Sequence, residues 1–132
     1  MQLCDISPLS GLYDLWSLSL SNNFIYDLSP LSALHNLTSL DLSGNAIQDF
    51  SLLMERPFTP RGNDYRFDLS YNQIQDIGSL PALEPGARLY LILSGNPIDP
   101  EHLPPEYQYQ GRLEKIILEG TEAGTHVTFQ FH

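Results

Sequence analysis

Leucine and isoleucine alternate with small polar residues in short stretches that recur along the chain. The pattern Leu-x-x-Leu-x-Leu-x-x-Asn-x-Ile occupies residues 15–25 and again residues 37–47. Shorter forms follow at residues 67–74 and 91–98, and a variant without the asparagine lies at residues 113–121. Because successive side chains of a strand point to opposite faces, each Leu-x-Leu stretch predicts a short strand whose leucines face a common core.

One asparagine marks the same place in four of these copies. The four are Asn23, Asn45, Asn72 and Asn96, and with Thr121 in the fifth copy the successive spacings are 22, 27, 24 and 25 residues. At this place the chain turns away from the strand, and an inward amide can bond backbone groups of its own repeat and of the next. We therefore expect a structural asparagine ladder and no ligand-binding role for these side chains.

A second pattern repeats between the expected strands. Residues 5–9 read Asp-Ile-Ser-Pro-Leu and residues 27–31 read Asp-Leu-Ser-Pro-Leu, at an offset of 22 residues. Serine followed by proline is typical of a helix start, so we expect short 3₁₀ or single-turn helices opposite the strands. The aspartates that recur once per unit are expected to bond turns and caps and not to bind a metal.

In these motifs the sequence resembles the leucine-rich repeat family, and specifically the bacterial internalin-like class with 22-residue repeats. The resemblance covers residues 3–121. It implies an α/β solenoid of about five coils, with short parallel strands on the concave face and 3₁₀ or short helical turns on the convex face. It also implies binding through the concave face, although such a repeat is a scaffold that leaves the function open.

We expect one domain over residues 1–132, since single domains commonly have about this length. An irregular insert at about residues 54–66 lengthens one repeat and is expected to be a surface loop, either a contact site or a tolerated insertion. Residues 99–110 replace the usual return segment with prolines and tyrosines. These tyrosines are expected either to make contacts or to cover the core.

The two ends of the chain depart from the repeat. Residues 125–132 alternate strongly and are expected to form a strand that caps the last coil, or alternatively an exposed edge that pairs with another chain. Leu3 takes the place of Ile25, so the first coil lacks its strand. We expect this open end to be sealed by a partner, by a second copy or by residues outside this sequence.

Composition and charge narrow the classes of function. Sixteen acidic and six basic residues give a net charge of −10, and no lysine or arginine precedes Arg56. This balance disfavours direct binding of nucleic acid or of an anionic membrane and suits a basic protein partner or plain solubility. No apolar run reaches the roughly 20 residues of a membrane span, and no signal peptide is visible, so a cytoplasmic location is expected.

The sequence predicts no catalytic, cofactor-binding or metal-binding residues. Its single cysteine, Cys4, excludes an internal disulfide, and the four histidines lack the spacing of metal ligands. No nucleophile elbow, phosphate-binding loop or dinucleotide fingerprint is present. We therefore expect a protein that is not an enzyme.

Candidate binding residues are the outward positions beside the inward leucines. They are small and polar in the first two copies, and they include tyrosine, isoleucine and charged residues in the last three. Such side chains mark candidate binding hot spots. The predicted partner-binding residues are Asp41, Arg66, Asp68, Tyr71, Tyr90, Ile92, Lys115 and Ile117. The alternative is that the C-terminal strand or the proline-rich segment folds over Ile92 and Ile117.

Three functions follow from these expectations. The first is a protein–protein interaction module that binds a partner through its concave face. The second is a small acidic inhibitor or immunity-type protein that blocks a basic, nucleic-acid-handling target by presenting carboxylates. The third is a fragment or subunit of a longer repeat array, with self-association through the open N-terminal coil.

Overall fold

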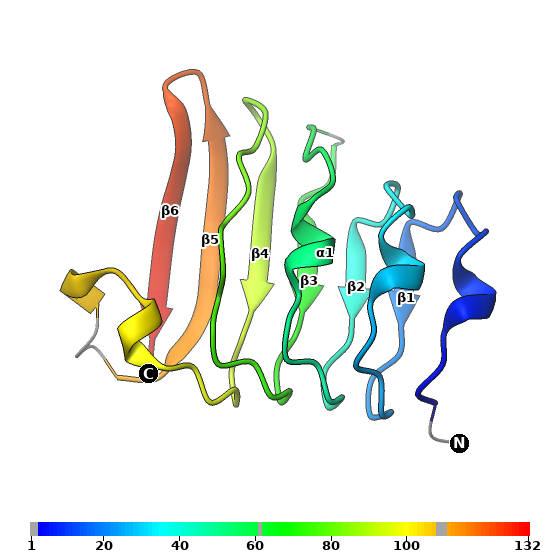
Figure 1. The fold of residues 1–132 in the computed structure, drawn as a ribbon. Coiled ribbons are helices and arrows are strands. Elements are labelled where there is room, and N and C mark those ends of the chain that lie inside the picture. The colour runs from blue at the N-terminus through cyan, green and yellow to red at the C-terminus, as the bar shows by residue number, and fades with distance from the viewer. Residues whose placement is uncertain (1–2, 61, 108–110) are drawn as a thin grey trace.

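A computed structural model describes residues 3–60, 62–107 and 111–132, and within them shows two layers, a six-stranded sheet and a layer of short helical turns (Figure 1). The strands are β1 (Ser17–Ser19), β2 (Ser39–Asp41), β3 (Tyr65–Asp68), β4 (Arg88–Ile92), β5 (Leu113–Thr121) and β6 (Gly124–Phe131). The 3₁₀ turns are η1 (Ser7–Leu9), η2 (Ser29–Leu31), η3 (Pro100–His102) and η4 (Pro105–Tyr107). A four-residue helix, α1 (Ser51–Met54), takes the place of a 3₁₀ turn in the third repeat.

The strands follow one another across the sheet in sequence order, and β1 to β4 are parallel. Leu18, Leu40, Phe67 and Leu91 are register partners in these four strands. The last three are buried, whereas Leu18 at the edge is half-buried. Each repeat therefore covers the apolar side chains of its neighbour, as expected for stacked coils that cannot bury a core alone.

The prediction of parallel strands throughout is wrong for the fifth copy, because β5 is antiparallel to β4. In the earlier repeats the chain returns across the helical layer before the next strand begins. After β4 it makes η3 and η4 close to the edge where β4 ends, so β5 starts from that same edge (Figure 1). Pro100, Pro104 and Pro105 fit these short turns, since proline fixes φ and lacks an N–H donor.

A hairpin ends the described chain. β6 pairs antiparallel with β5 along its length, and Gly124 adopts φ 128° at the turn. Val127, Phe129 and Phe131 point to the core side, where Tyr107 packs on Phe129 and Phe131 with ring centroids 4.8 and 5.8 Å apart. β6 thus continues the sheet at its edge and does not fold over either face.

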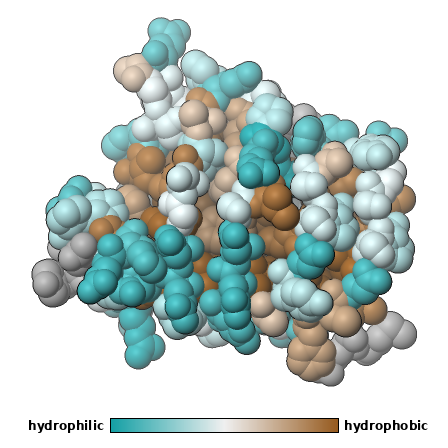
Figure 2. Space-filling view, in the orientation of Figure 1, coloured by the Kyte–Doolittle hydropathy of each residue, from teal (hydrophilic) through white to brown (hydrophobic). Residues whose placement is uncertain are grey.

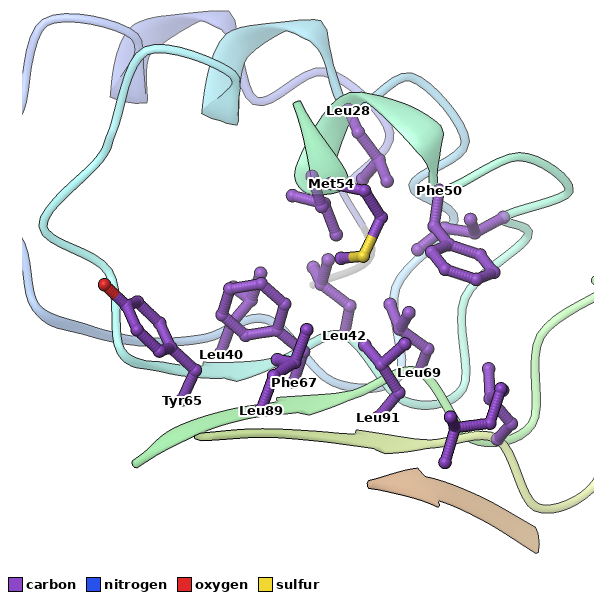
Figure 3. Close-up of a cluster of buried hydrophobic side chains, with 14 of the residues drawn as sticks. Leu28, Leu40, Leu42, Phe50, Met54, Tyr65, Phe67, Leu69, Leu89 and Leu91 are labelled. Carbon is purple, nitrogen blue, oxygen red and sulfur yellow. The ribbon is translucent and has the colours of Figure 1, made fainter. Parts of the chain in front are cut away.

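The hydrophobic core lies between the sheet and the helical layer. Phe50 and Met54 extend from the helical side toward apolar side chains of β2, β3 and β4 (Figure 3). The helical side itself exposes hydrophobic surface between the repeats, while hydrophilic side chains gather at the lower left of this view (Figure 2).

The insert at about residues 54–66 is exposed over much of its length, but some of its side chains reach the core. Met54, Arg56, Phe58 and Tyr65 are all buried, and the rings of Phe58 and Tyr65 meet edge to face with centroids 4.9 Å apart. The exposed part includes Glu55, Pro57, Pro60 and residues 62–64. Arg61, the second base of this insert, lies outside the described residues, as do residues 108–110 of the proline- and tyrosine-rich segment.

Candidate functional site: the open face of the sheet

The face of the sheet opposite the helical turns, here called the open face, carries side chains in two rows. The strand register aligns Ser17, Ser39, Arg66, Tyr90, Ile117 and Thr128 in one row and Ser19, Asp41, Asp68, Ile92, Lys115 and Gln130 in the other. These positions alternate with the buried leucines, so their side chains point away from the core. The predicted strand residues therefore share one face, with serine at the β1 end and large side chains around β4 and β5.

Asp41 and Asp68 form a pair of neighbouring carboxylates on this face. They are register partners in β2 and β3, and both are half-buried. Asp41 accepts hydrogen bonds from the backbone N–H and the hydroxyl of Ser43, at 3.0 and 2.7 Å. Asp68 accepts the same two bonds from Ser70, at 3.0 and 2.6 Å. The repeated Asp-x-Ser sequence thus holds two negative charges in fixed positions.

Tyr90 lies between two cationic side chains. The Nζ of Lys115 is 5.9 Å from the centroid of the Tyr90 ring, within the range of a cation–π contact. Arg88 donates from Nη1 to the Tyr90 hydroxyl at 3.3 Å and forms an ion pair with Glu119 at 3.4 Å. The hydrogen bond to Tyr90 raises the pKa of Arg88, and the charge of Glu119 raises it further by a smaller effect. These contacts orient the tyrosine ring.

Ile92 and Ile117 complete an apolar patch with Tyr90. Tyr90 and Ile117 are register partners, Ile92 pairs with Lys115, and all four side chains are half-buried. The alternative that the C-terminal strand or the proline-rich segment covers this patch is wrong for the described residues. β6 lies beside β5, and Tyr107 packs on the core side of the sheet.

The structure does not place Tyr71 with the other candidates. Tyr71 follows β3 in a turn, with φ 57°, and its ring lies against Gly95. It is 67% exposed at the edge of the sheet. Arg66 is also exposed, but it stands on β3 beside Tyr90 in the register. The candidate site is therefore Asp41, Asp68, Arg66, Tyr90, Ile92, Lys115 and Ile117, and its binding role stays a prediction.

The asparagines bond backbone groups of two repeats. Asn45 accepts from the Ile25 N–H at 2.9 Å and donates to the carbonyls of Leu20 and Leu42 at 3.0 and 2.9 Å. Asn72 and Asn96 make the corresponding bonds one and two repeats later. The bonds reach the preceding repeat, whereas we had expected the next one. Their amides are fully engaged in holding the chain.

Arg56 is a buried residue that the sequence analysis did not single out. It is 4% exposed and donates to the carbonyls of Leu34, Leu31 and Leu53 at 2.7, 3.0 and 3.1 Å. Burial lowers its pKa to about 10. Its Cζ also lies 5.6 Å from the centroid of the Phe67 ring. The guanidinium thus ties α1 to the preceding return segment. The only sequence signal for the burial of Arg56 was the presence of apolar residues near it in the chain.

Two of the features that we considered, a metal-binding cluster and a membrane-spanning helix, can be checked in the described residues. Within residues 3–60, 62–107 and 111–132, no three histidine, cysteine, aspartate or glutamate side chains are placed to hold a metal ion. None of the helices in this part of the chain has the length and apolar character needed to cross a membrane.

Comparison with known proteins supports the repeat interpretation. Residues 17–53 match the family model of leucine-rich repeats, in two copies. The matched segment extends from β1 into α1 and makes up a little over a quarter of the chain. No curated protein matches the sequence. The match supports a leucine-rich repeat protein, a class that commonly mediates protein–protein interaction and is generally not enzymatic.

Proposed function

We propose that the protein is an interaction module that binds a partner protein through the open face of its sheet. On this proposal the open face is the concave face of a leucine-rich repeat solenoid of the internalin-like, 22-residue class. The observation that supports binding there is the patch of Tyr90, Ile92 and Ile117, which is displayed on the paired strands β4 and β5. Half-buried aromatic and aliphatic side chains surrounded by charge are typical of interface hot spots.

The charges on the open face define the partner further. Arg66 and Lys115 stand beside the apolar patch, and the carboxylates of Asp41 and Asp68 lie on the β2 and β3 side of it. A matching partner presents an apolar anchor to Tyr90, Ile92 and Ile117 and a basic group to the two aspartates. Rim charges of this kind mainly set the association rate and its dependence on salt.

Affinity capture with matched variants tests this function. The bait is the full chain, immobilised and exposed to nuclease-treated lysate of its source, with the retained proteins identified by mass spectrometry. The test variant carries Y90A, I92A and I117A, and the control variant carries Q48A, Q73A and Q75A, exposed side chains that lie away from this patch. The proposal expects one dominant protein that the test variant loses and the control variant retains. A dominant protein retained equally by both variants contradicts it.

A further inference from the structure

The open face orders its charges along one of its two rows. From β2 to β5 the side chains of this row are Asp41, Asp68, Ile92 and Lys115. Because neighbouring strands lie about 4.8 Å apart, about 12 Å separates the middle of the aspartate pair from Lys115. The row thus presents negative charge, an apolar side chain and positive charge in line.

The aspartate pair carries charge that no ion pair of the described chain neutralises. Asp41 and Asp68 stand directly opposite each other, an arrangement of like charges that destabilises a sheet. Within residues 3–60, 62–107 and 111–132, neither carboxylate belongs to an ion pair. The serine bonds of both aspartates end on Oδ1. Oδ2 has no such partner and is not buried, so it can accept a hydrogen bond from a basic group of a ligand.

Lys115 holds the positive charge at the other end of the row. Its Nζ lies over the Tyr90 ring, and in the part of the chain that the structure describes it forms no ion pair. Nearby charged groups are already engaged. Arg88 has its ion pair, and the Glu114 carboxylate accepts from the Ser94 hydroxyl at 3.0 Å. Lys115 is therefore the cation at this end of the row that remains for an acidic group of a ligand.

The spacing of these features matches an extended polypeptide. Side chains on one face of a strand recur about every 6.7 Å, so three successive ones span about 13 Å. The first then meets Asp41 and Asp68, the second meets Ile92, and the third meets Lys115. A helix is about 10–12 Å wide with its side chains and would also cover the neighbouring row, where its basic side chain would meet Arg66. The single row therefore favours an extended segment that crosses the strands.

We infer that the partner protein contacts the open face with an extended segment that carries a basic, an apolar and an acidic side chain at alternate positions. Its basic side chain binds Asp41 and Asp68, its apolar side chain packs on Ile92, and its acidic side chain binds Lys115. A uniformly basic segment is disfavoured, although the whole chain has a net charge of −10, because it would bring a cation to Lys115. This inference rests on the proposed function, since it describes the partner of the same face.

Synthetic peptides with blocked ends and a fluorescent label test the charge pattern. The dipolar peptide contains Lys-Thr-Phe-Thr-Glu, and the basic peptide contains Lys-Thr-Phe-Thr-Lys, in which threonine favours an extended backbone. Fluorescence anisotropy with the full chain at low salt gives the Kd of each peptide. The dipolar peptide should bind at least about fivefold more tightly than the basic peptide, which is the reverse of what net charge alone predicts. Equal or tighter binding of the basic peptide overturns the inference, as does a dipolar peptide that does not bind.

A third peptide tests the spacing. It contains Lys-Phe-Glu-Thr-Thr, which has the composition of the dipolar peptide but places phenylalanine on the opposite face from lysine and glutamate in an extended chain. It should bind at least about fivefold more weakly than the dipolar peptide, because its apolar side chain no longer reaches the sheet together with its charges. Equal binding of the two peptides overturns the extended segment.

Reversing the charge at Lys115 should reverse the preference between the dipolar and basic peptides. The K115E variant should bind the basic peptide at least about fivefold more tightly than the dipolar peptide. The control variant carries Q73E and Q75E, which change the net charge equally at exposed side chains away from the open face. The control should keep the preference of the original chain. A K115E variant that still prefers the dipolar peptide overturns the inference.

Neutralising the aspartate pair tests the basic end of the segment. D41N with D68N keeps Oδ1 as an acceptor for the serine bonds, so the fold is retained while the charge is lost. This pair should weaken the dipolar peptide about fivefold. D49N with D76N changes the net charge equally at exposed aspartates that also accept from turns, and it should leave the Kd unchanged. Equal weakening by both pairs overturns the inference.

The variant with Y90A, I92A and I117A separates this inference from the proposed function. If all the peptides bind equally and this variant loses them all, the open face binds but the inferred charge pattern is wrong. If affinity capture yields a partner that this variant loses while the dipolar peptide does not bind, the inference alone fails. If the variant retains both the captured partner and the dipolar peptide, the binding site lies elsewhere and both proposals fail.

Discussion

The ring of Tyr71 packs against Gly95, which occupies the same position one repeat later. A Cβ at Gly95 would overlap Cδ1 and Cε1 of Tyr71. Both residues have left-handed backbone, with φ 57° and 72°. Asn22 and Gly44 repeat the relationship at the other end of the sheet, with φ 60° and 71°. The turn after each of β1 to β4 thus adopts a left-handed residue, and glycine is required where the preceding repeat supplies a larger side chain.

Replacing Gly95 with alanine should destabilise the protein by more than backbone strain alone. Left-handed backbone costs an alanine about 1–2 kcal/mol, and the Tyr71 ring must also move. Gly78→Ala is the control, because Gly78 has φ 66° but nothing within 4 Å of its added Cβ. Urea unfolding should show a larger loss for Gly95→Ala. Equal losses would show that the Tyr71 contact contributes nothing.

Asn45→Ala should lower the free energy of unfolding by about 1–3 kcal/mol, because buried backbone groups lose their partner. The groups are the Ile25 N–H and the carbonyls of Leu20 and Leu42. Asn63→Ala, in an exposed turn, should change stability by less than about 0.5 kcal/mol. Thermal or urea unfolding measures both. An Asn45→Ala protein with an unchanged free energy of unfolding would contradict the stabilising role of the asparagine ladder.

Arg56→Ala should cost about 3 kcal/mol, since bonds to a charged donor contribute about 1.5–3 kcal/mol. It leaves the carbonyls of Leu31, Leu34 and Leu53 without this donor. Arg56→Lys should recover only part of the loss, because lysine has no planar fork to reach all three. Arg112→Ala, at an exposed side chain, is the control for removing a positive charge. A stable Arg56→Ala protein would contradict this assignment.

Acid should weaken the return segments in a defined range of pH. Hydrogen bonds from the backbone and side chain of Ser51 lower the pKa of Asp49. The corresponding hydrogen bonds from Ser29 lower the pKa of Asp27. A carboxyl with a lowered folded pKa stabilises the fold above its unfolded value of about 3.9 and loses that contribution as pH falls through the folded pKa.

The variant D49N tests that pH dependence directly. Asparagine can still accept the Ser51 bond but does not titrate, so the stability of D49N should fall less between neutral and acidic pH. Unfolding midpoints measured at a series of pH values give the comparison. Identical pH profiles for D49N and the original chain would show that the Asp49 carboxylate does not contribute.

Local periodicity was sufficient to predict the repeating part of the fold. Leu40 and Leu42 alternate with polar residues, and the Ser-Pro pair at residues 29–30 begins η2. The direction of β5 was not predictable in this way. Ile116 and Leu118 face the core in either direction, so their spacing does not distinguish parallel from antiparallel pairing.

Contacts between distant residues account for the other differences. The carbonyls that bind Arg56 belong to Leu31 and Leu34, 25 and 22 residues earlier, and nothing near Arg56 in the sequence indicates them. Outward alternation correctly placed Tyr90 and Ile117 on one face. Tyr71 was assigned to the same site, but it lies beyond the end of β3 at Asp68, in a left-handed turn that carries the side chain to the edge.

The central claim is that the patch of Tyr90, Ile92 and Ile117 binds the partner protein. The most direct test is the affinity of the purified captured partner for the original chain and for the variant with Y90A, I92A and I117A, both checked for an unchanged fold. Three hot-spot truncations of more than about 1 kcal/mol each predict a Kd raised at least about hundredfold. The control variant with Q48A, Q73A and Q75A should keep the original Kd. An unchanged Kd for the open-face variant would contradict the account.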